Sequence, residues 1–584
     1  MRPALSLLAL SLPLLSLPLG LACKHKRADD SGGTGDGGGD TGPAAYAPDL
    51  HCPGDASCPD VDGALKVGVS KVVITPTCFE GWEDLDGNAE YDDHNESFLD
   101  CGCDRLCPGD AGYVAPDDGE GDGVFQAVWM AGFQNARSAQ GINDDLWARA
   151  IVFDQGSTRV ALVEVDLVGY FRTDLEVARG KVDALGLDVD HVIVAATHTH
   201  EGPDTMGLWG KTSSQSGVDP AYMESVNSAI AQAVQQAVGN LKQVGSMKVG
   251  SVDVGTYSDK GVYNVITDLR DPIVIDETMD GAAFWDTDGT IIASLAHFAS
   301  HPESNADENL QLTSDFPYGL RQAMEDGTHW EAYDKAGLGG QAIFINGAVG
   351  GMMTGLRVDV TDPDGTTWQP YSLDRSHVMG QLLGEMALDA IDGGTPAESP
   401  TLSLAVKRFK YPVENWGFQA LFLTGIIERQ LYDYDSSKPI DDSNVPSIET
   451  ELDVLQVGPI RFLTCPGELF PELNIGGYDG SHTGSADAWL VAPDNKNPPD
   501  LSQAPAAPYI KERAGGSRVW LVGLGNDELG YVVPEYDFQL DATNPWFDEA
   551  PGDHYEETNS LGPQTAGIYD SQVDLLVGWV DANQ

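Results

Sequence analysis

The chain has 584 residues, and its 32 Lys and Arg against 91 Asp and Glu give a formal net charge of -59. This negative charge excludes nucleic acid as an expected partner, because the phosphate backbone would be repelled. Hydrophobic residues make up 41% of the chain, which is enough for a sizeable buried core and excludes a disordered chain.

The N-terminus predicts an export signal. "MRPALSLLALSLPLLSLPLGLAC" has one basic residue, an apolar region and a small residue before Cys23, which is typical of a signal cut before a lipidated cysteine. We therefore expect a signal peptide over residues 1–22 and an exported lipoprotein anchored through Cys23 to the cell envelope, in the periplasm, the outer membrane or at the cell surface. The Gly/Asp-rich segment that follows predicts a flexible tether over residues 23–60.

Most of the cysteines are concentrated in one N-terminal segment, from Cys52 to Cys107. In an exported chain such a cluster predicts disulfides, and zinc binding is the alternative. The sequence contains no clean CxxC pair, which favours disulfides over zinc. The sequence does not assign the pairing. Cys465 stands apart and is expected to be buried, whereas the clustered cysteines are Cys52, Cys58, Cys78, Cys101, Cys103 and Cys107.

An acidic insertion is predicted at about residues 78–123. It contains "WEDLDGNAEYDD" and "DDGEGDG", in which carboxylates are spaced by Gly and Asn. Ca²⁺ takes oxygen ligands of this kind, so Asp84, Asp86, Asn88 and Asp92 form a candidate calcium site. The alternative is a solvated acidic loop, since glycine is at the wrong offset for an EF-hand.

The rest of the chain alternates apolar strands with amphipathic helices. A helix is predicted over Asp219 to Leu241, with Asp219 as N-cap and Pro220 at the first helical position. Strands that are apolar on both faces and separated by helices predict an α/β fold, with a sheet that is covered on both sides and a mixed β-sheet core covered by helices. The predicted strands are 159–168, 192–197, 290–296, 342–346, 454–465 and 518–524.

Several of these strands end in side chains that can bind metal. His198 and His200 follow one strand in "VIVAATHTHEGPD", and His301 follows another in "LAHFASHPES". Glu468 ends "IRFLTCPGE", and Tyr531 lies in "GLGNDELGYVV". Imidazole and carboxylate are zinc ligands, and ligands of α/β proteins collect at strand ends. From the residues alone, these side chains could instead be ordinary polar groups at strand ends that bind no metal.

These motifs resemble, in the same order, those of the neutral, non-lysosomal ceramidases, zinc amidases that split ceramide. The resemblance begins at "VGVSKVVITP", includes "THTHEGP", "HFASHPES" with the later "SD", "CPGE" and "GLGNDELGYVV", and ends in "HYEETNSLGPQTAGIYD". It implies a ceramidase-like catalytic domain over residues 61–584. The β-sandwich domain that usually follows is not expected within this chain.

The resemblance also implies a site. Zinc would be bound by His198, His301, Glu468 and Tyr531, the last of which could instead bond to the transition state. Asp315 would orient His301, and His200 would stabilise an oxyanion or relay a proton. Because zinc lowers the pKa of a bound water towards ~7, water could attack the acyl carbon directly.

Two segments depart from the family pattern. The family's serine segment, "QSNVGD", corresponds to "NGAVGG" here, which puts Gly347 where the serine stands. The family's "NRS" segment is not recognisable around "VYNVITDLRDP". The predicted reaction is therefore hydrolysis of an N-acyl amide, such as ceramide or a related N-acyl lipid, without the serine.

Two alternatives remain open. The first is a non-catalytic, ceramidase-like surface lipoprotein that binds a lipid or glycan. The second is a zinc esterase or amidase for a different substrate, such as cell-wall material. The sequence does not indicate an oligomeric state.

Overall fold

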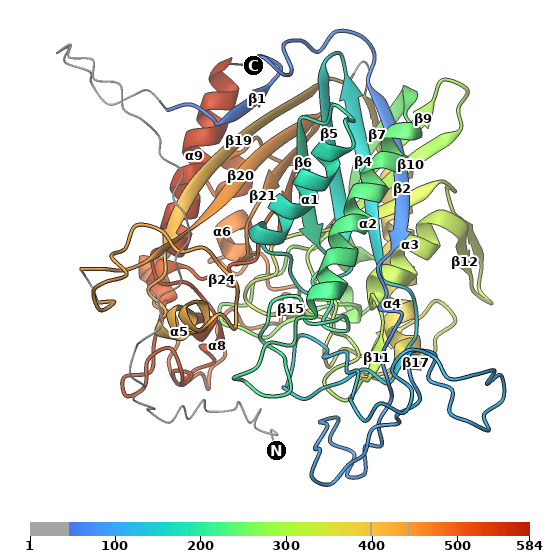
Figure 1. Ribbon diagram of the computed structural model, residues 1–584. Coiled ribbons are helices and arrows are strands. Elements are labelled where there is room, and N and C mark those ends of the chain that lie inside the picture. The colour runs from blue at the N-terminus through green and yellow to red at the C-terminus, as the bar shows by residue number, and fades with distance from the viewer. Residues whose placement is uncertain (1–45, 398–399, 442, 584) are drawn as a thin grey trace, which may run out of the picture.

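The computed structural model describes residues 46–397, 400–441 and 443–583 (Figure 1). The predicted signal peptide, Cys23 and the tether up to residue 45 lie outside the described residues. Among the helices of the described part, none combines the length and apolar character needed to cross a membrane.

The larger of the two main sheets has nine strands. Its order is β14-β10-β9-β7-β2-β4-β5-β6, with β18 beside β7. Two pairs are parallel, β5 with β6 and β10 with β14, and both lie at the ends of this order. The strands are β2 (Lys66–Val73), β4 (Trp147–Gln155), β5 (Thr158–Val165), β6 (His191–Ala196), β7 (Lys242–Asp253), β9 (Thr278–Asp286), β10 (Ile291–Phe298), β14 (Gln341–Asn346) and β18 (Thr395–Ala397).

The smaller sheet has five strands in the order β1-β19-β20-β21-β23. The single strand predicted over 454–465 is wrong, because β20 and β21 form an antiparallel hairpin there. Gly458 between them has a φ of +54°, a conformation that glycine adopts without strain and that reverses the chain. The strands are β1 (Leu50–Cys52), β19 (Leu402–Pro412), β20 (Ser447–Val457), β21 (Ile460–Thr464) and β23 (Val519–Val522).

The two sheets pack face to face, with helices outside them (Figure 1). Ile151 and Phe153 of β4 point to the second sheet, whereas Ala150 and Val152 face the helices, as strand alternation requires. The outer helices on the larger sheet are α1 (Arg172–Ala184), α2 (Pro220–Gly239), α3 (Phe316–Asp326) and α4 (Leu373–Asp392); α9 (Thr565–Asn583) covers the smaller sheet.

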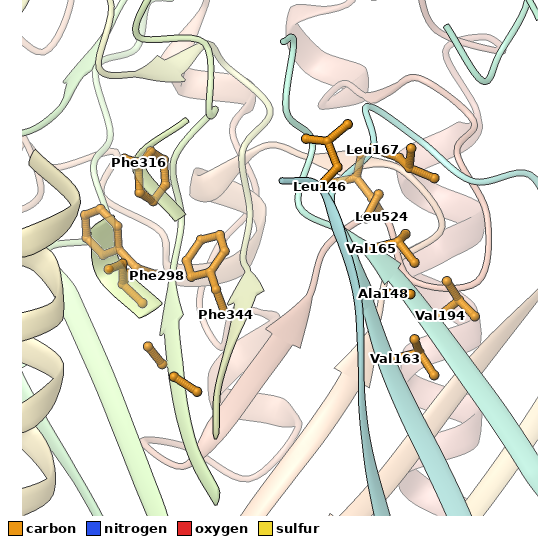
Figure 2. Packing of buried hydrophobic residues seen from close by; sticks show 14 of the residues in the cluster. Leu146, Ala148, Val163, Val165, Leu167, Val194, Phe298, Phe316, Phe344 and Leu524 are labelled. Carbon is orange, nitrogen blue, oxygen red and sulfur yellow. The ribbon is translucent and has the colours of Figure 1, made fainter. Parts of the chain in front are cut away.

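The predicted fold class is confirmed, with one refinement. Each sheet is covered by helices on one face and by the other sheet on its second face. Figure 2 shows two groups of side chains from the helix-facing core, one around Phe298, Phe316 and Phe344 and one around Val163, Val165 and Val194. The predicted helix is confirmed as α2, where the Asp219 side chain accepts a hydrogen bond from the backbone N–H of Ala221.

Shorter elements connect the layers and carry much of the site. The helices are α5 (Trp416–Thr424), α6 (Pro471–Ile475), α7 (Ile510–Arg513) and α8 (Tyr555–Thr558). The strands are β3 (Gly141–Ile142), β8 (Thr267–Asp268), β11 (Gln311–Leu312), β12 (Gly327–His329), β13 (Asp334–Ala336), β15 (Met353–Thr354), β16 (Val360–Thr361), β17 (Thr367–Trp368), β22 (Glu468–Leu469) and β24 (Tyr531–Val532).

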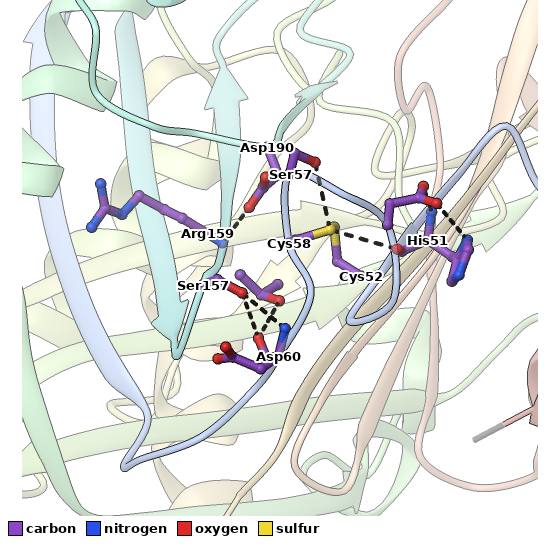
Figure 3. Close-up of a disulfide and its surroundings, with 10 residues drawn as sticks. His51, Cys52, Ser57, Cys58, Asp60, Ser157, Arg159 and Asp190 are labelled. Carbon is purple, nitrogen blue, oxygen red and sulfur yellow. Dashed lines mark hydrogen bonds and ion pairs between the residues drawn. A yellow bond between two sulfur atoms is a disulfide. The ribbon is translucent and has the colours of Figure 1, made fainter.

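The predicted disulfides are confirmed. The bonds join Cys52 to Cys58, Cys78 to Cys103 and Cys101 to Cys107, and Cys465 is free and buried. Figure 3 shows the Cys52–Cys58 bond near Asp190, whose carboxylate accepts a hydrogen bond from the Arg159 backbone. The first disulfide begins at Cys52, the last residue of β1, which pairs with β19, so the described end of the expected tether is packed on the smaller sheet.

Candidate functional site

Side chains from several strand ends meet in one buried cluster. His198 and His200 come from the loop after β6, and His301 comes from the loop after β10. Glu468 and Tyr531 are direct neighbours in the short parallel pair of β22 and β24. Segments separated by more than 300 residues are therefore brought together, as the strand-end motifs predicted.

The two histidines after β6 point into the same site because the backbone turns between them. His198 lies in the left-handed region, with a φ of +70°. Its Nδ1 donates to the backbone carbonyl of Val168 at 2.5 Å, and its Nε2 is 3.4 Å from Nε2 of His200. The left-handed residue turns the chain so that both rings contact each other.

His301 and Glu468 complete the cluster. Nδ1 of His301 donates to the backbone carbonyl of Met353 at 2.9 Å, and its Nε2 is 3.0 Å from Oε2 of Glu468. The same carboxylate oxygen is 3.5 Å from Nε2 of His198. One carboxylate oxygen thus lies between two imidazole nitrogens.

The electrostatics of the cluster favour a charged pair of Glu468 and His301 beside a neutral His200. Burial raises the pKa of Glu468, but the charges and hydrogen bonds of His198 and His301 lower it to about 2. Burial lowers the pKa of His301, whereas the hydrogen bond to Glu468 and the charge of Glu303 raise it to about 9. Burial, together with the charges of the other two histidines, holds the pKa of His200 well below its usual value.

The donor set fits a metal ion. Ligand atoms of His198, His200 and His301 lie within 4.8 Å of one another, and all three residues are buried. The carbonyls of Val168 and Met353 take the Nδ1–H groups of two rings, which leaves Nε2 of each ring facing Glu468. Backbone partners of this kind orient histidine ligands in metalloproteins.

Tyr531 lies at the edge of the cluster. Its side chain is buried, and its hydroxyl donates to Sδ of Met352 at 3.4 Å. Burial and the Glu468 charge hold its pKa well above the usual value. The structure places Tyr531 beside Glu468 in register, and its role as a ligand stays a prediction.

The predicted role of Asp315 is wrong. Asp315 caps α3: its Oδ1 accepts from the backbone N–H of Phe316 at 2.6 Å, and its Oδ2 accepts from Asn305 at 2.8 Å. Both ring nitrogens of His301 have other partners, the Met353 carbonyl and Glu468. The backbone, and not an acidic side chain, orients His301.

Gly347 directly follows β14, and the structure leaves little room for a side chain there. A Cβ atom would lie 3.1 Å from Cβ of Ala299 and 3.2 Å from Nε2 of His297. Asn346 before it connects two site loops, since its amide donates to the carbonyls of Thr197 and Ser300. Neighbouring side chains therefore pack closely against the position where the resemblance puts a serine, and a side chain there would crowd them.

A largely apolar pocket opens onto the cluster. His198, His200, Glu468 and Tyr531 belong to its lining. The wall consists mainly of aliphatic and aromatic side chains, namely Val168, Phe171, Met206, Leu208, Trp209, Phe418, Phe422, Ile427, Ile448, Leu529 and Leu561. Phe418 and Phe422 belong to α5, which also exposes Trp416 and Leu423 to solvent at 56% and 54% of their surfaces.

Sequence reasoning missed four polar residues at or near this pocket. Glu303 lies behind His200, and Arg429, Glu528 and Tyr555 line the pocket. Glu303 and Tyr555 lie inside motifs already singled out, "HFASHPES" and "HYEETNSLGP", so their chemistry could have been noted there. No sequence signal pointed to Arg429.

The segment without a recognisable "NRS" motif holds a buried ion-pair network. Arg270, only 2% exposed, donates to Glu556 at 2.5 Å, to Asp537 at 2.9 Å and to both oxygens of Glu557 at 3.1 Å. Glu556 directly follows Tyr555, whose ring lies 6.0 Å from that of Tyr531. Arg270 thus fixes the segment that carries one wall of the pocket.

The candidate calcium residues are divided between two surface groups. Asp84 and Asp86 gather with Glu96, whereas Asp92 gathers with Asp93 and His94. The Asn88 amide donates to Asp86 at 3.4 Å. Asp84 and Asp86 thus belong to a different candidate group from Asp92, and calcium binding by the four predicted residues stays a prediction.

Comparisons with known proteins agree with the motifs. No family model matches the chain. Over 206 residues the chain is 26% identical to the neutral ceramidase of Pseudomonas aeruginosa, and this segment covers 33% of the chain and 30% of that relative.

Structural likeness extends much further along the chain. A crystal structure of neutral ceramidase from Pseudomonas aeruginosa matches with a TM-score of 0.56 and 15% identity, over 89% of this chain and 75% of the other. A ceramidase complexed with C2 matches with a TM-score of 0.56 and 16% identity, over 89% and 76%. The chain therefore has the fold of the neutral ceramidases, and the resemblance that its motifs indicated is confirmed.

Proposed function

We propose that the protein is a zinc-dependent hydrolase that cleaves an N-acyl amide, ceramide or a related N-acyl lipid, without a serine nucleophile. The observation that carries this proposal is the convergence of His198, His301 and Glu468 beside a largely apolar pocket, which His198 and Glu468 line. Sequence similarity to a neutral ceramidase supports hydrolase chemistry at the level of the family.

In this proposal zinc is held by His198, His301, Glu468 and Tyr531. When bound, zinc would lower the pKa of a water molecule and would polarise the substrate carbonyl. Imidazole and carboxylate donors are those that zinc takes in catalytic sites. The buried rings are held by backbone carbonyls, so they are oriented before any ligand binds.

In this proposal His200 transfers protons to and from the reacting atoms. It lines the pocket and contacts His198, and its ring packs edge-on against Phe133, with centroids 5.4 Å apart. Its low pKa keeps the ring neutral, so it can take a proton from water and return one to the departing amine. A neutral imidazole is the form that a proton carrier needs at the start of the reaction.

The pocket wall supports a lipid-like substrate. Phe171, Met206, Leu208 and Phe422 offer apolar surface of the kind that an acyl chain buries. The exposed residues of α5 lie next to this wall, where a membrane lipid would enter. An anchor at Cys23, if the sequence prediction holds, would keep the pocket near a membrane.

Metal analysis and substrate turnover test the proposal together. We expect about one zinc per chain, as in mononuclear zinc hydrolases, and release of fatty acid from a fluorescent N-acyl sphingosine. Chelation should abolish turnover, and added zinc should restore it. A protein without stoichiometric zinc would refute the metal assignment.

A panel of N-acyl amines, esters and peptides separates the alternatives. Turnover of esters or peptides alone would indicate a different hydrolase. Binding of N-acyl lipid that is insensitive to chelator, with no turnover of any substrate, would instead support the non-catalytic lipoprotein. The tight packing around Gly347 does not decide between them, because the proposed reaction uses water.

A further inference from the structure

Glu528 is a buried acid of the pocket, and the proposed reaction does not yet use it. The residue lines the pocket, and only 3% of its surface is exposed. Its Oε1 accepts a hydrogen bond from the backbone N–H of Gly530 at 2.8 Å, whereas Oε2 is buried and has no hydrogen-bond partner among the described residues. A carboxylate accepts about four hydrogen bonds, so most of this capacity is unused.

The unsatisfied carboxyl group indicates a ligand. A buried polar group without a partner costs free energy, and such groups in folded proteins nearly always have one. Arg429, which also lines the pocket, is already engaged, because its guanidinium donates to both carboxylate oxygens of Asp527, to Oδ2 at 2.9 Å. A molecule bound in the pocket can supply the partner that Glu528 lacks.

Glu528 contacts the backbone that orients the buried cluster. Its side chain packs on Gly169, where a Cβ atom would lie 2.8 Å from Cγ of Glu528 and 2.7 Å from Sδ of Met206. Gly169 directly follows Val168, whose carbonyl accepts the hydrogen bond from the ring of His198. A substrate group that meets Glu528 is therefore close to the bond that would be cleaved.

A hydroxyl group fits this carboxyl better than the other groups of an N-acyl lipid. A hydroxyl both donates and accepts hydrogen bonds, so it pairs with the carboxyl whether or not the acid carries a proton. The methylene groups of an acyl chain offer no donor, and they bury against the apolar wall instead. The amide itself lies at His198, His301 and Glu468 in the proposed reaction.

We propose that Glu528 is a specificity-determining residue, which binds a hydroxyl group that the substrate carries close to its scissile amide. The proposal rests on the proposed function, the hydrolysis of an N-acyl amide. It narrows the substrate to a hydroxylated N-acyl amide and excludes a plain N-alkyl fatty amide. Two sources supply this chemistry, the amine side in an N-acyl amino alcohol and the first carbon after the carbonyl in a hydroxylated acyl chain.

Three short-chain amides with the same carbon skeleton test this role. The octanoyl amide of serinol has hydroxyls on the amine side, the isopropylamide of α-hydroxyoctanoic acid has one on the acyl side, and the isopropylamide of octanoic acid has none. For each amide we would measure kcat/KM with the wild type, Glu528→Gln and Glu528→Leu, and zinc per chain for each protein. Glu535→Leu is the matched control, since Glu535 is an exposed acid on the same segment.

The decisive quantity is the ratio of kcat/KM between a hydroxylated amide and the plain amide, which does not depend on the fraction of enzyme that is folded. The wild type should prefer one hydroxylated amide ~10- to 100-fold, the range for a hydrogen bond to a charged group. In Glu528→Leu this preference should disappear, because activity falls on the hydroxylated amide alone. Glu528→Gln, which keeps hydrogen-bonding groups, should retain part of the preference, and Glu535→Leu all of it.

The preferred amide identifies the source of the hydroxyl. Preference for the serinol amide would indicate an N-acyl amino alcohol as substrate, and preference for the other hydroxylated amide would indicate a hydroxylated acyl chain.

Two outcomes would overturn the proposal. A wild type that shows no preference for a hydroxyl would mean that none is bound. An unchanged ratio in Glu528→Leu, with equal loss on all three amides and loss of zinc, would assign Glu528 to support of the buried cluster. If the wild type hydrolyses none of the amides, the proposed function fails; the dissociation constants of the same amides, measured by titration calorimetry on the wild type and Glu528→Leu, still decide whether Glu528 binds the hydroxyl.

Discussion

Arg270 offers a direct test of how the site is supported. Its guanidinium lies among the carboxylates of Asp537, Glu556 and Glu557, at distances of 2.5 to 3.1 Å. Burial lowers the pKa of Arg270, but these carboxylates raise it well above its usual value. The positive charge is therefore required to keep three acids together in the interior.

Replacing Arg270 with Met removes the charge while keeping an unbranched side chain. Removing one partner of a buried ion pair costs about 3–5 kcal/mol, because the remaining charges stay buried and unpaired. We expect the lower half of this range, since some acids can take up protons. The network adjoins Tyr555, so Arg270→Met should also reduce activity in the fraction that remains folded.

Urea unfolding followed by tryptophan fluorescence measures the loss of stability. The control is Lys410→Met, which removes the partner of the exposed Asp433 at 2.9 Å and should hardly move the unfolding midpoint. If the midpoint of Arg270→Met matches that of the control, with the same slope, the network does not stabilise the fold. The reasoning about the Tyr555 wall would then be refuted as well.

Three further predictions concern the site itself. His301→Ala should lose zinc and N-acyl hydrolysis together, whereas His329→Ala, at an exposed histidine, should lose neither; metal analysis and product assay check this. Gly347→Ser should lower stability by about 1–3 kcal/mol through overpacking and should not raise kcat, as urea unfolding and turnover would report. Trp416→Ser with Leu423→Ser should raise KM severalfold for N-acyl lipid in neutral vesicles but not for a soluble short-chain analogue.

A specific result would contradict each of these predictions. Zinc retained at full content in His301→Ala would remove this residue from the ligand set. A clear gain of turnover in Gly347→Ser would mean that a serine can reach the substrate despite the packing. Equal changes in KM for vesicle and soluble substrates would assign the α5 residues to the pocket and not to a lipid surface.

Local sequence determined much of this protein. Apolar runs gave the core strands, and Asp219 with Pro220 marked the start of α2, because strand burial and helix capping depend on neighbouring residues. His198, His301 and Glu468 could be singled out because each follows an apolar run. The cysteine cluster indicated disulfides, although not their pairing.

Tertiary structure decided what these residues do. The φ of His198 sets the direction of its ring, and the pairing of β22 with β24 puts Glu468 beside Tyr531. Asp315 caps a helix instead of holding His301, and Glu303 reaches His200 across two loops. The Glu468–Tyr531 and Glu303–His200 contacts join residues about 60 and about 100 positions apart, and their geometry depends on strand register and loop conformation, which no local pattern contains.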